Sequence, residues 1–213
     1  MIYKVFGPYR IRRQGRLIAK TPQHLRAFWS EIEAEAAGLP DACGCYVFSI
    51  RRRAWYVGLA EKQSFCRECF ALHKLNQYNY SLHHVSGEPQ LHLVAKLTPT
   101  GRFAAPALNG HRDIRFLETL LIGMALNQNE DLQNIRGTKF LREMRVPGIL
   151  RTARGEGRLS PVRSLRDALG MSGPPRKTVV DVSAPTATEP AATNPPPLPT
   201  HGEKGARTAH TAE

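Results

Sequence analysis

One stretch of this chain constrains its fold more than any other: residues 44–58, which read GCYVFSIRRRAWYVG. Apolar and aromatic residues alternate on both sides of three consecutive arginines, Arg51, Arg52 and Arg53. Alternation with a period of two is typical of β-strands, and a polar loop between two such runs is typical of a hairpin. The stretch therefore predicts two antiparallel strands joined by a basic turn.

The length of the arginine loop decides which side chains of this hairpin share a face. With all three arginines in the loop, the expected pairs are Ile50 with Ala54, Phe48 with Tyr56, and Tyr46 with Gly58. Tyr46 and Tyr56 would then lie on one face, and the glycine opposite Tyr46 would leave an open pocket for a ligand. A shift of one residue would separate the tyrosines, and a plain hairpin with both phenols in a core is the alternative interpretation.

Charge and length narrow the classes of function. The chain has 213 residues, enough for one domain with a sizeable core plus appendages. Its 30 Lys and Arg against 18 Asp and Glu give a net charge of +12, which suits a polyanion, with nucleic acid first and an acidic membrane surface second. No apolar run approaches the roughly 20 residues that span a bilayer, and the N-terminus lacks the pattern of a signal peptide. We therefore expect a cytoplasmic protein without a membrane segment.

The N-terminal residues 1–40 predict an extension that packs on the main domain. They read as two short strands, around Gly7-Pro8 and Gln14-Gly15, that form a hairpin. Thr21 then caps a helix that begins with a proline and ends near Gly38.

The C-terminal part predicts little packed structure. Residues 151–170 read as a basic linker with a short helix that starts at Ser160. Residues 171–213 are dominated by Pro, Ala, Thr, Ser and Gly, and such a composition buries too little apolar surface to fold. We expect a disordered tail.

The region after the hairpin predicts one long helix and a third strand. The helix would follow Ser64 and run to about Tyr80, with a buried stripe formed by Phe65, Cys69, Leu72 and Leu75. Its opposite side would be a cationic edge, either solvated or phosphate-binding, formed by Arg67, Lys74 and Tyr78. Residues 91–97 are apolar enough for a strand inside a small sheet.

The four cysteines allow two interpretations. The pairs Cys43-x-Cys45 and Cys66-x-x-Cys69 suggest a zinc site of four thiolates. However, the first pair enters a predicted strand and the second lies inside a predicted helix. Small buried hydrophobic side chains in a reducing compartment are the favoured interpretation.

One acidic residue stands out in a further predicted helix, at about residues 113–127. At 100° per residue, Glu118 falls in the middle of the apolar face that is formed by Ile114, Leu121, Ile122 and Ala125. An unpaired buried carboxylate is so unfavourable that it takes up a proton, pairs with a cation or binds a metal. The open interpretations are an internal ion pair with an arginine, a metal ligand and a catalytic acid.

Taken together, these features resemble the GIY-YIG nuclease family in order and spacing. The matching positions are Gly44-Cys45-Tyr46, Tyr56-Val57-Gly58, an arginine in the following helix, Glu118 and Asn134. The resemblance covers about residues 44–136 and implies a nuclease domain at residues 41–150. It implies a mixed α/β (α+β) fold, with a small three-stranded antiparallel sheet flanked by helices, that cuts phosphodiester bonds with one divalent metal.

The resemblance also implies a role for each matching residue. Glu118 would hold Mg²⁺ or Mn²⁺ against a phosphate oxygen, since a hard cation needs oxygen ligands. Tyr46 would be the general base that activates the attacking water, and Tyr56 would orient that water or share its proton. Arg67 would stabilise the phenolate and clamp the phosphate. Asn134 would brace the site by hydrogen bonds.

The sequence departs from the family pattern at two positions. Cys45 stands where an isoleucine is usual, and the arginine comes one place late, because the common register holds Cys66. Lys62, His73 and Lys74 are the alternatives to Arg67. We assign contact with nucleic acid to a set of basic residues, namely Arg51, Arg52, Arg53, Lys62, His73 and Lys74.

These observations lead to three hypotheses. The first is a metal-dependent endonuclease that acts on DNA. The second is a module of the same fold that binds DNA or RNA without turnover, which would show salt-sensitive binding and no metal-dependent product. The third is a structural zinc protein.

Overall fold

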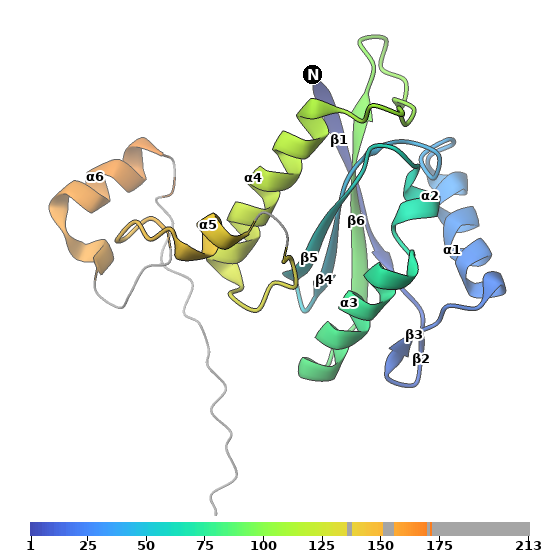
Figure 1. The fold of residues 1–213 in the computed structure, drawn as a ribbon, viewed down its shortest axis with the longest axis horizontal. Coiled ribbons are helices and arrows are strands. Elements are labelled where there is room, and N and C mark those ends of the chain that lie inside the picture. Colours follow the sequence, from blue (N-terminus) through green and yellow to red (C-terminus); the bar gives the residue numbers. More distant parts are fainter. Residues whose placement is uncertain (136–137, 151–155, 170, 172–213) are drawn as a thin grey trace, which may run out of the picture. The chain divides into compact units, whose positions relative to one another are not determined.

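Four antiparallel strands form the central sheet of the computed structural model, with helices on both faces (Figure 1). The order across the sheet is β1 (Ile2–Arg10), β6 (Pro89–Leu97), β4 (Gly44–Ile50) and β5 (Arg53–Ala60). A separate small hairpin pairs β2 (Arg13–Gln14) with β3 (Leu17–Ile18). The structure describes residues 1–135, 138–150, 156–169 and 171.

Two groups of helices sandwich the sheet. One face packs against α1 (Pro22–Glu35), α2 (Phe65–Glu68) and α3 (Leu72–His84), and its core includes Phe28, Phe48 and Tyr78. The other face packs against α4 (Arg112–Gln128), whose Ile114 contacts Cys45 and whose Ile122 contacts Val57. The remaining helices are α5 (Lys139–Glu143), a 3₁₀ turn at Glu156–Arg158 and α6 (Ser160–Ala168).

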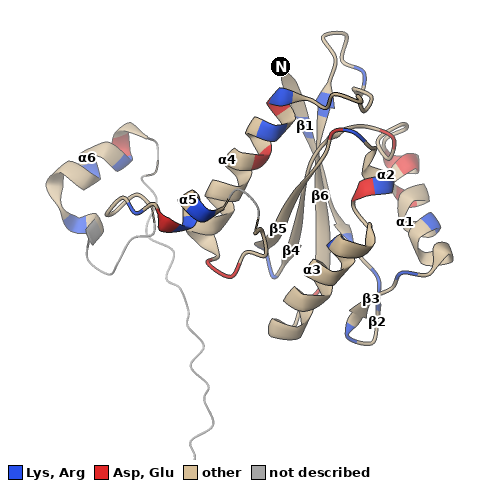
Figure 2. Cartoon of the chain, in the orientation of Figure 1, with Lys and Arg blue, Asp and Glu red and all other residues tan. Residues whose placement is uncertain are grey.

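Charged residues lie mainly on the helices and turns, and the central strands carry few of them (Figure 2). Among the described residues, no helix combines the length and apolar character that crossing a bilayer requires. Residues 172–213, most of the predicted disordered tail, lie outside the described part of the chain.

The prediction of a three-stranded sheet is wrong, because the N-terminus adds a fourth strand. β1 pairs with β6 from Ile2 opposite Leu97 to Arg10 opposite Gln90. The sequence predicted that a strand around Gly7-Pro8 belongs to an N-terminal hairpin, but this strand pairs with β6, with an irregularity in register between Phe6 and Tyr9. Proline is tolerated there because β1 is an edge strand, where a missing N–H breaks no central ladder. The first 40 residues therefore supply a strand of the same sheet.

The hairpin confirms the predicted pairs of Tyr46 with Gly58 and Phe48 with Tyr56. The predicted three-residue loop is wrong, since Arg53 already belongs to β5 and pairs with Ile50. The turn consists of Arg51 and Arg52, with φ of 51° and 62°, as in the two-residue turns that match strand twist.

A bulge explains why an incorrect loop still gave the correct tyrosine pairs. Ser49 pairs with Ala54 and Phe48 with Tyr56, so the register shifts between them and Trp55 is the extra residue. The shorter turn and the bulge offset each other by one residue. Tyr46 and Tyr56 consequently lie on the same face, although the path between them differs from the prediction.

The predicted single helix after Ser64 is wrong, because α2 ends at Glu68 and α3 starts at Leu72. The break allows Phe70 to pack edge-on against Phe28, with ring centroids 5.1 Å apart. In one continuous helix Phe70 would lie about 140° away from Phe65, and both could not be buried in this core.

The break also changes the face that α3 presents to the sheet. Leu72, predicted to be buried, is 68% exposed, whereas Tyr78, predicted on the cationic edge, is fully buried. Lys74 turns toward the sheet, and only 12% of its side chain is exposed. This change of register brings a lysine to the tyrosines of the hairpin.

A candidate active site at the edge of the sheet

The two tyrosines of the hairpin lie side by side on the face that α3 covers. Their ring centroids are 6.3 Å apart. Tyr46 lies in the central strand β4 and is fully buried, and Tyr56 lies in the edge strand β5 and is 9% exposed. The shared face confirms the prediction, but the two phenols have different surroundings.

The open pocket predicted opposite Tyr46 does not exist. The ring of Tyr46 lies directly over Gly58, and a Cβ atom on Gly58 would clash with the Cζ and Oη atoms of that ring. The glycine is required because the tyrosine occupies the space of its side chain.

The hydroxyl of Tyr46 is poorly placed for a general base. It is buried and makes no well-aligned hydrogen bond to any residue that the structure describes. Burial, followed by the neighbouring Tyr78 and Cys69, raises the pKa of Tyr46 well above its ordinary value. Tyr46 is therefore held in its neutral form.

Tyr56, in contrast, has a cationic partner. The Nζ atom of Lys74 donates to the Oη atom of Tyr56 at 2.6 Å and lies 5.0 Å from the centroid of the same ring. The same ammonium lies 3.5 Å from Oε1 of Glu68. The largely buried ammonium of Lys74 therefore links the hydroxyl of Tyr56 to the carboxylate of Glu68.

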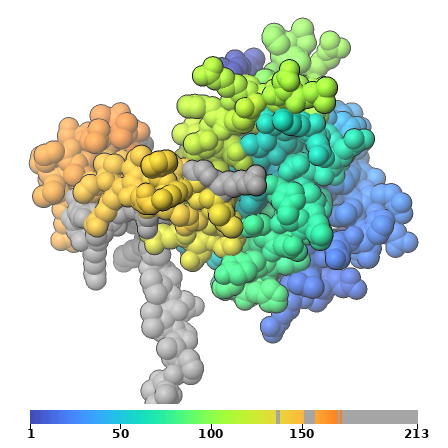
Figure 3. Space-filling model, in the orientation of Figure 1, coloured from blue at the N-terminus to red at the C-terminus, as the bar shows by residue number. Residues whose placement is uncertain are grey.

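Glu118 lies on α4, within electrostatic reach of the same lysine. Burial raises the pKa of Glu118 to about 7; the charge of Lys74 opposes this shift, and Glu61 and Glu68 add to it. No salt bridge joins Glu118 to an arginine within the described part of the chain, so the predicted internal ion pair is not formed there. Both α3, in green, and α4, in yellow-green, are visible in the view of Figure 3, although they pack on opposite faces of the sheet.

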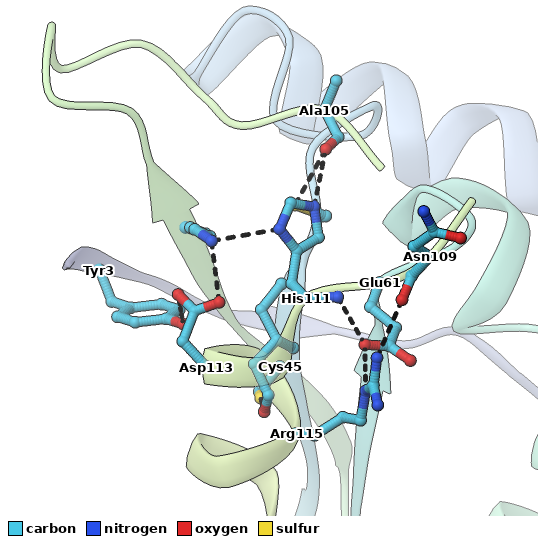
Figure 4. Close-up of polar contacts among 11 residues, drawn as sticks. Tyr3, Cys45, Glu61, Ala105, Asn109, His111, Asp113 and Arg115 are labelled. Atoms are coloured by element: carbon cyan, nitrogen blue, oxygen red, sulfur yellow. Dashed lines mark hydrogen bonds and ion pairs between the residues drawn. The ribbon is translucent and has the colours of Figure 1, made fainter. Parts of the chain in front are cut away.

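Sequence reasoning missed a second glutamate, Glu61, which follows β5 directly. Its carboxylate accepts hydrogen bonds from the backbone N–H of His111 at 2.8 Å and from Nε of Arg115 at 2.9 Å (Figure 4). Burial alone would raise the pKa of Glu61, but these hydrogen bonds hold it below its ordinary value. Gly110 faces the carboxylate so closely that a Cβ atom there would clash with it. Glu61 thereby joins the end of β5 to the start of α4.

A second polar network fixes the start of α4 to β1 and β6 (Figure 4). Asp113 accepts hydrogen bonds from Tyr3 at 2.8 Å and from Lys96 at 2.9 Å. Lys96 also lies 3.1 Å from Nδ1 of His111, whose Nε2 lies 3.1 Å from the carbonyl of Ala105. Because the ammonium can only donate, Nδ1 of His111 accepts this hydrogen bond, and Nε2 faces the carbonyl as the donor. The helix that carries Glu118 is thus anchored at its N-terminus.

Asn134 braces the edge strand, as the resemblance implies. Its Oδ1 accepts from the backbone N–H of Val57 at 2.9 Å, and its Nδ2 donates to the carbonyl of the same residue at 2.6 Å. Val57 follows Tyr56, so this pair of bonds fixes the backbone beside the phenol.

The other predicted basic residues lie outside this cluster. Arg67, Lys62 and His73 are exposed, and the side chain of Arg67 makes no hydrogen bond or ion pair to a described residue. Arg51 and Arg52 form the turn at the far end of the hairpin, and Arg53 donates to the carbonyl of Gln128. Of the predicted cations, Lys74 is the one that contacts a tyrosine.

The four cysteines do not form a metal-binding cluster. Across the described residues, which include all four, no group of three or more His, Cys, Asp and Glu side chains could hold a metal. Cys43 and Cys45 donate to the carbonyls of Ala105 and Ile114, each at 3.4 Å. A hard cation that keeps most of its waters does not need such a group, and the half-buried carboxylate of Glu118 fits that requirement.

Comparison with models of known protein families, with curated proteins and with solved structures gave no significant match.

Proposed function

We propose that this protein is an endonuclease that hydrolyses phosphodiester bonds in DNA with the help of Mg²⁺ or Mn²⁺. One observation carries the proposal: a half-buried glutamate with a pKa raised to about 7 lies within electrostatic reach of a lysine that binds a tyrosine hydroxyl. The net charge of +12 supports a polyanionic substrate.

The geometry favours a division of roles that differs from the one the resemblance implied. Tyr56 accepts the proton of the attacking water. Lys74 stabilises the negative charge on the oxygen of Tyr56 and at the phosphate, which is the role that the resemblance gave to Arg67. Tyr46 stays protonated and positions the ring of Tyr56 by packing beside it. Asn134 fixes the strand that carries Tyr56.

Glu118 is the residue that would hold the cation. A bound Mg²⁺ or Mn²⁺ would supply Lewis acidity toward the phosphate. Glu118 must be ionised for this role, and its raised pKa means that ionisation is complete only above neutral pH. The oxygen of the water would attack phosphorus as the bond from phosphorus to the leaving oxygen breaks. For this step Tyr56 must be a phenolate, which takes up the proton of the water, and the leaving oxygen takes a proton from solvent.

The direct test is cleavage of supercoiled plasmid DNA with Mg²⁺ or with EDTA. We expect the wild-type chain to nick the plasmid only with Mg²⁺, and Glu118→Ala and Tyr56→Phe each to lose about 10²-fold or more in rate. The matched controls are Glu143→Ala and Tyr80→Phe, which remove the same groups from exposed positions. Cleavage that survives both site variants would remove the assigned mechanism.

A second candidate function, binding of nucleic acid without turnover, is favoured by the position of Arg67. That residue matches the family pattern most nearly, yet it contacts neither tyrosine in the structure. This alternative predicts a gel shift that weakens as salt is added and no product that depends on metal.

A further inference from the structure

A hollow with a volume of about 650 Å³ lies at the end of the sheet where β1 finishes and β6 begins. Three arginines line it, Arg10, Arg12 and Arg13, together with His24 from α1. Residues 87–89, at the start of β6, also line it. The proposed active site does not use any of these residues.

The arginines of the hollow form only exposed ion pairs or a hydrogen bond to a backbone carbonyl. Arg10 pairs with Glu88, and Arg12 lies 3.2 Å from Glu31, but the side chains of Arg12 and Glu31 are 62% and 65% exposed. Exposed pairs of this kind contribute little to stability, so an incoming anion can compete for the guanidinium groups. Arg13 donates to the carbonyl of Gly87 at 3.1 Å, which leaves its charge without an acidic partner among the described residues.

The basic turn of the central hairpin extends the same surface. Arg51 donates to Oγ of Ser86 at 2.7 Å, and its Cγ atom lies against Gly87 in the wall of the hollow. In Figure 2, basic segments mark the chain around β2 and β3 at this end of the sheet. Arg51 and the three arginines of the hollow therefore outnumber the two glutamates, and guanidinium groups match the geometry of phosphate.

We infer that this hollow binds a phosphodiester of the DNA strand that enters the proposed active site, at a position several nucleotides from the cut. The inference rests on the proposed function. Tyr56 lies four residues from Arg52 along the hairpin, or roughly 13 Å at the rise of a β-strand. A strand of DNA is long enough to contact both places, whereas a free mononucleotide is not.

The test measures binding without cleavage. A fluorescein-labelled DNA duplex of 20 base pairs is titrated with the full chain in EDTA at several salt concentrations, and anisotropy gives Kd. For the double variant Arg12→Ala/Arg13→Ala we expect a weaker Kd and a salt slope that is smaller in magnitude by about 1, because one phosphate contact is lost. The matched control is Arg102→Ala/Arg112→Ala, which removes the same charge beyond the other end of β6 and should change the slope by less than about 0.5.

The outcomes separate this inference from the proposed function. Equal slopes for the two double variants would overturn the hollow as a DNA site, whatever the cleavage assay shows. Thymidine monophosphate is added as a competitor, up to millimolar concentration. If it displaced the duplex with the same affinity as the oligonucleotide, the inference would also be overturned, in favour of a mononucleotide site. A smaller slope in a chain that never cuts DNA would support the hollow and refute the endonuclease.

Discussion

At the scale of single residues, the decisive difference is between two tyrosines that the sequence treats as equals. Both occupy the same face of the hairpin, as the alternation predicted. Tyr46 is enclosed over Gly58, and Tyr56 at the sheet edge meets an ammonium. Their surroundings depend on the register of α3, which the periodicity misplaced, so the sequence could not assign the base correctly.

Lys74 is expected to matter more than Arg67 for cleavage. Lys74→Met removes the ammonium that donates to Oη of Tyr56, and we expect the turnover rate to fall by about 10²-fold. The matched control is Arg67→Met, for which we expect less than about a threefold change, since only a surface charge is lost. Rates of plasmid nicking under saturating Mg²⁺ measure both. The opposite order of effects would restore the role that the family resemblance gave to Arg67.

Glu118 is expected to make the metal-free fold less stable as the pH rises. Its pKa of about 7 in the folded chain exceeds the value of 4.5 for an unperturbed glutamate, so the folded state holds its proton more tightly. The contribution of this group is fully favourable below about pH 4.5 and is lost as the pH rises through 7. Because the group is partly exposed, we expect Glu118→Gln to increase the free energy of unfolding at pH 8 by only about 1 kcal/mol.

Urea unfolding of Glu118→Gln and wild type in EDTA measures that difference. The difference should shrink toward zero at about pH 4, below both pKa values, where Glu118 is mainly neutral in the folded and the unfolded chain. A Gln variant that is less stable than wild type at pH 8 would show that the carboxylate is paired in the fold.

At the scale of elements, the packing of the hairpin depends on the contact between the ring of Tyr46 and the backbone of Gly58. Gly58→Ala places a methyl group inside the ring of Tyr46, and we expect a loss of about 1–3 kcal/mol in the free energy of unfolding, as in other overpacked cores. The control is Gly123→Ala in the helix α4, where the nearest atom is 3.8 Å away; it should be neutral or stabilising by up to about 1 kcal/mol. Equal effects on urea unfolding would contradict this packing.

Some of the helices and strands could be predicted from the sequence, and others could not. Local alternation gave the strands β4 and β5, and helical spacing placed Glu118 on the inner part of α4. The division between α2 and α3 was missed because it depends on Phe70 finding Phe28 in a helix about 40 residues earlier. Glu61 was missed for the same reason, since its partners His111 and Arg115 lie about 50 residues later.

At the scale of the whole molecule, the class of fold could be predicted, but the number of strands in the sheet could not. Residues 1–40 predicted a hairpin and a helix that pack on the main domain, whereas β1 is a strand of the main sheet. Its place beside β6 depends on a partner about 90 residues away, which local patterns do not reveal. With β1 in place, the sheet has a basic end at the hollow and an edge at β5 with the candidate active site.

The measurement that tests the central claim most directly is a titration of the full chain with Mn²⁺ at pH 8, with binding detected by electron paramagnetic resonance. Our account predicts one bound Mn²⁺ per chain, loss of that binding in Glu118→Gln, and weaker binding at pH 6, where Glu118 is largely protonated. It also predicts that the sample that binds Mn²⁺ nicks plasmid DNA and that the variant does not. Unchanged Mn²⁺ binding in Glu118→Gln would contradict the account, because no other described residue has been given that role.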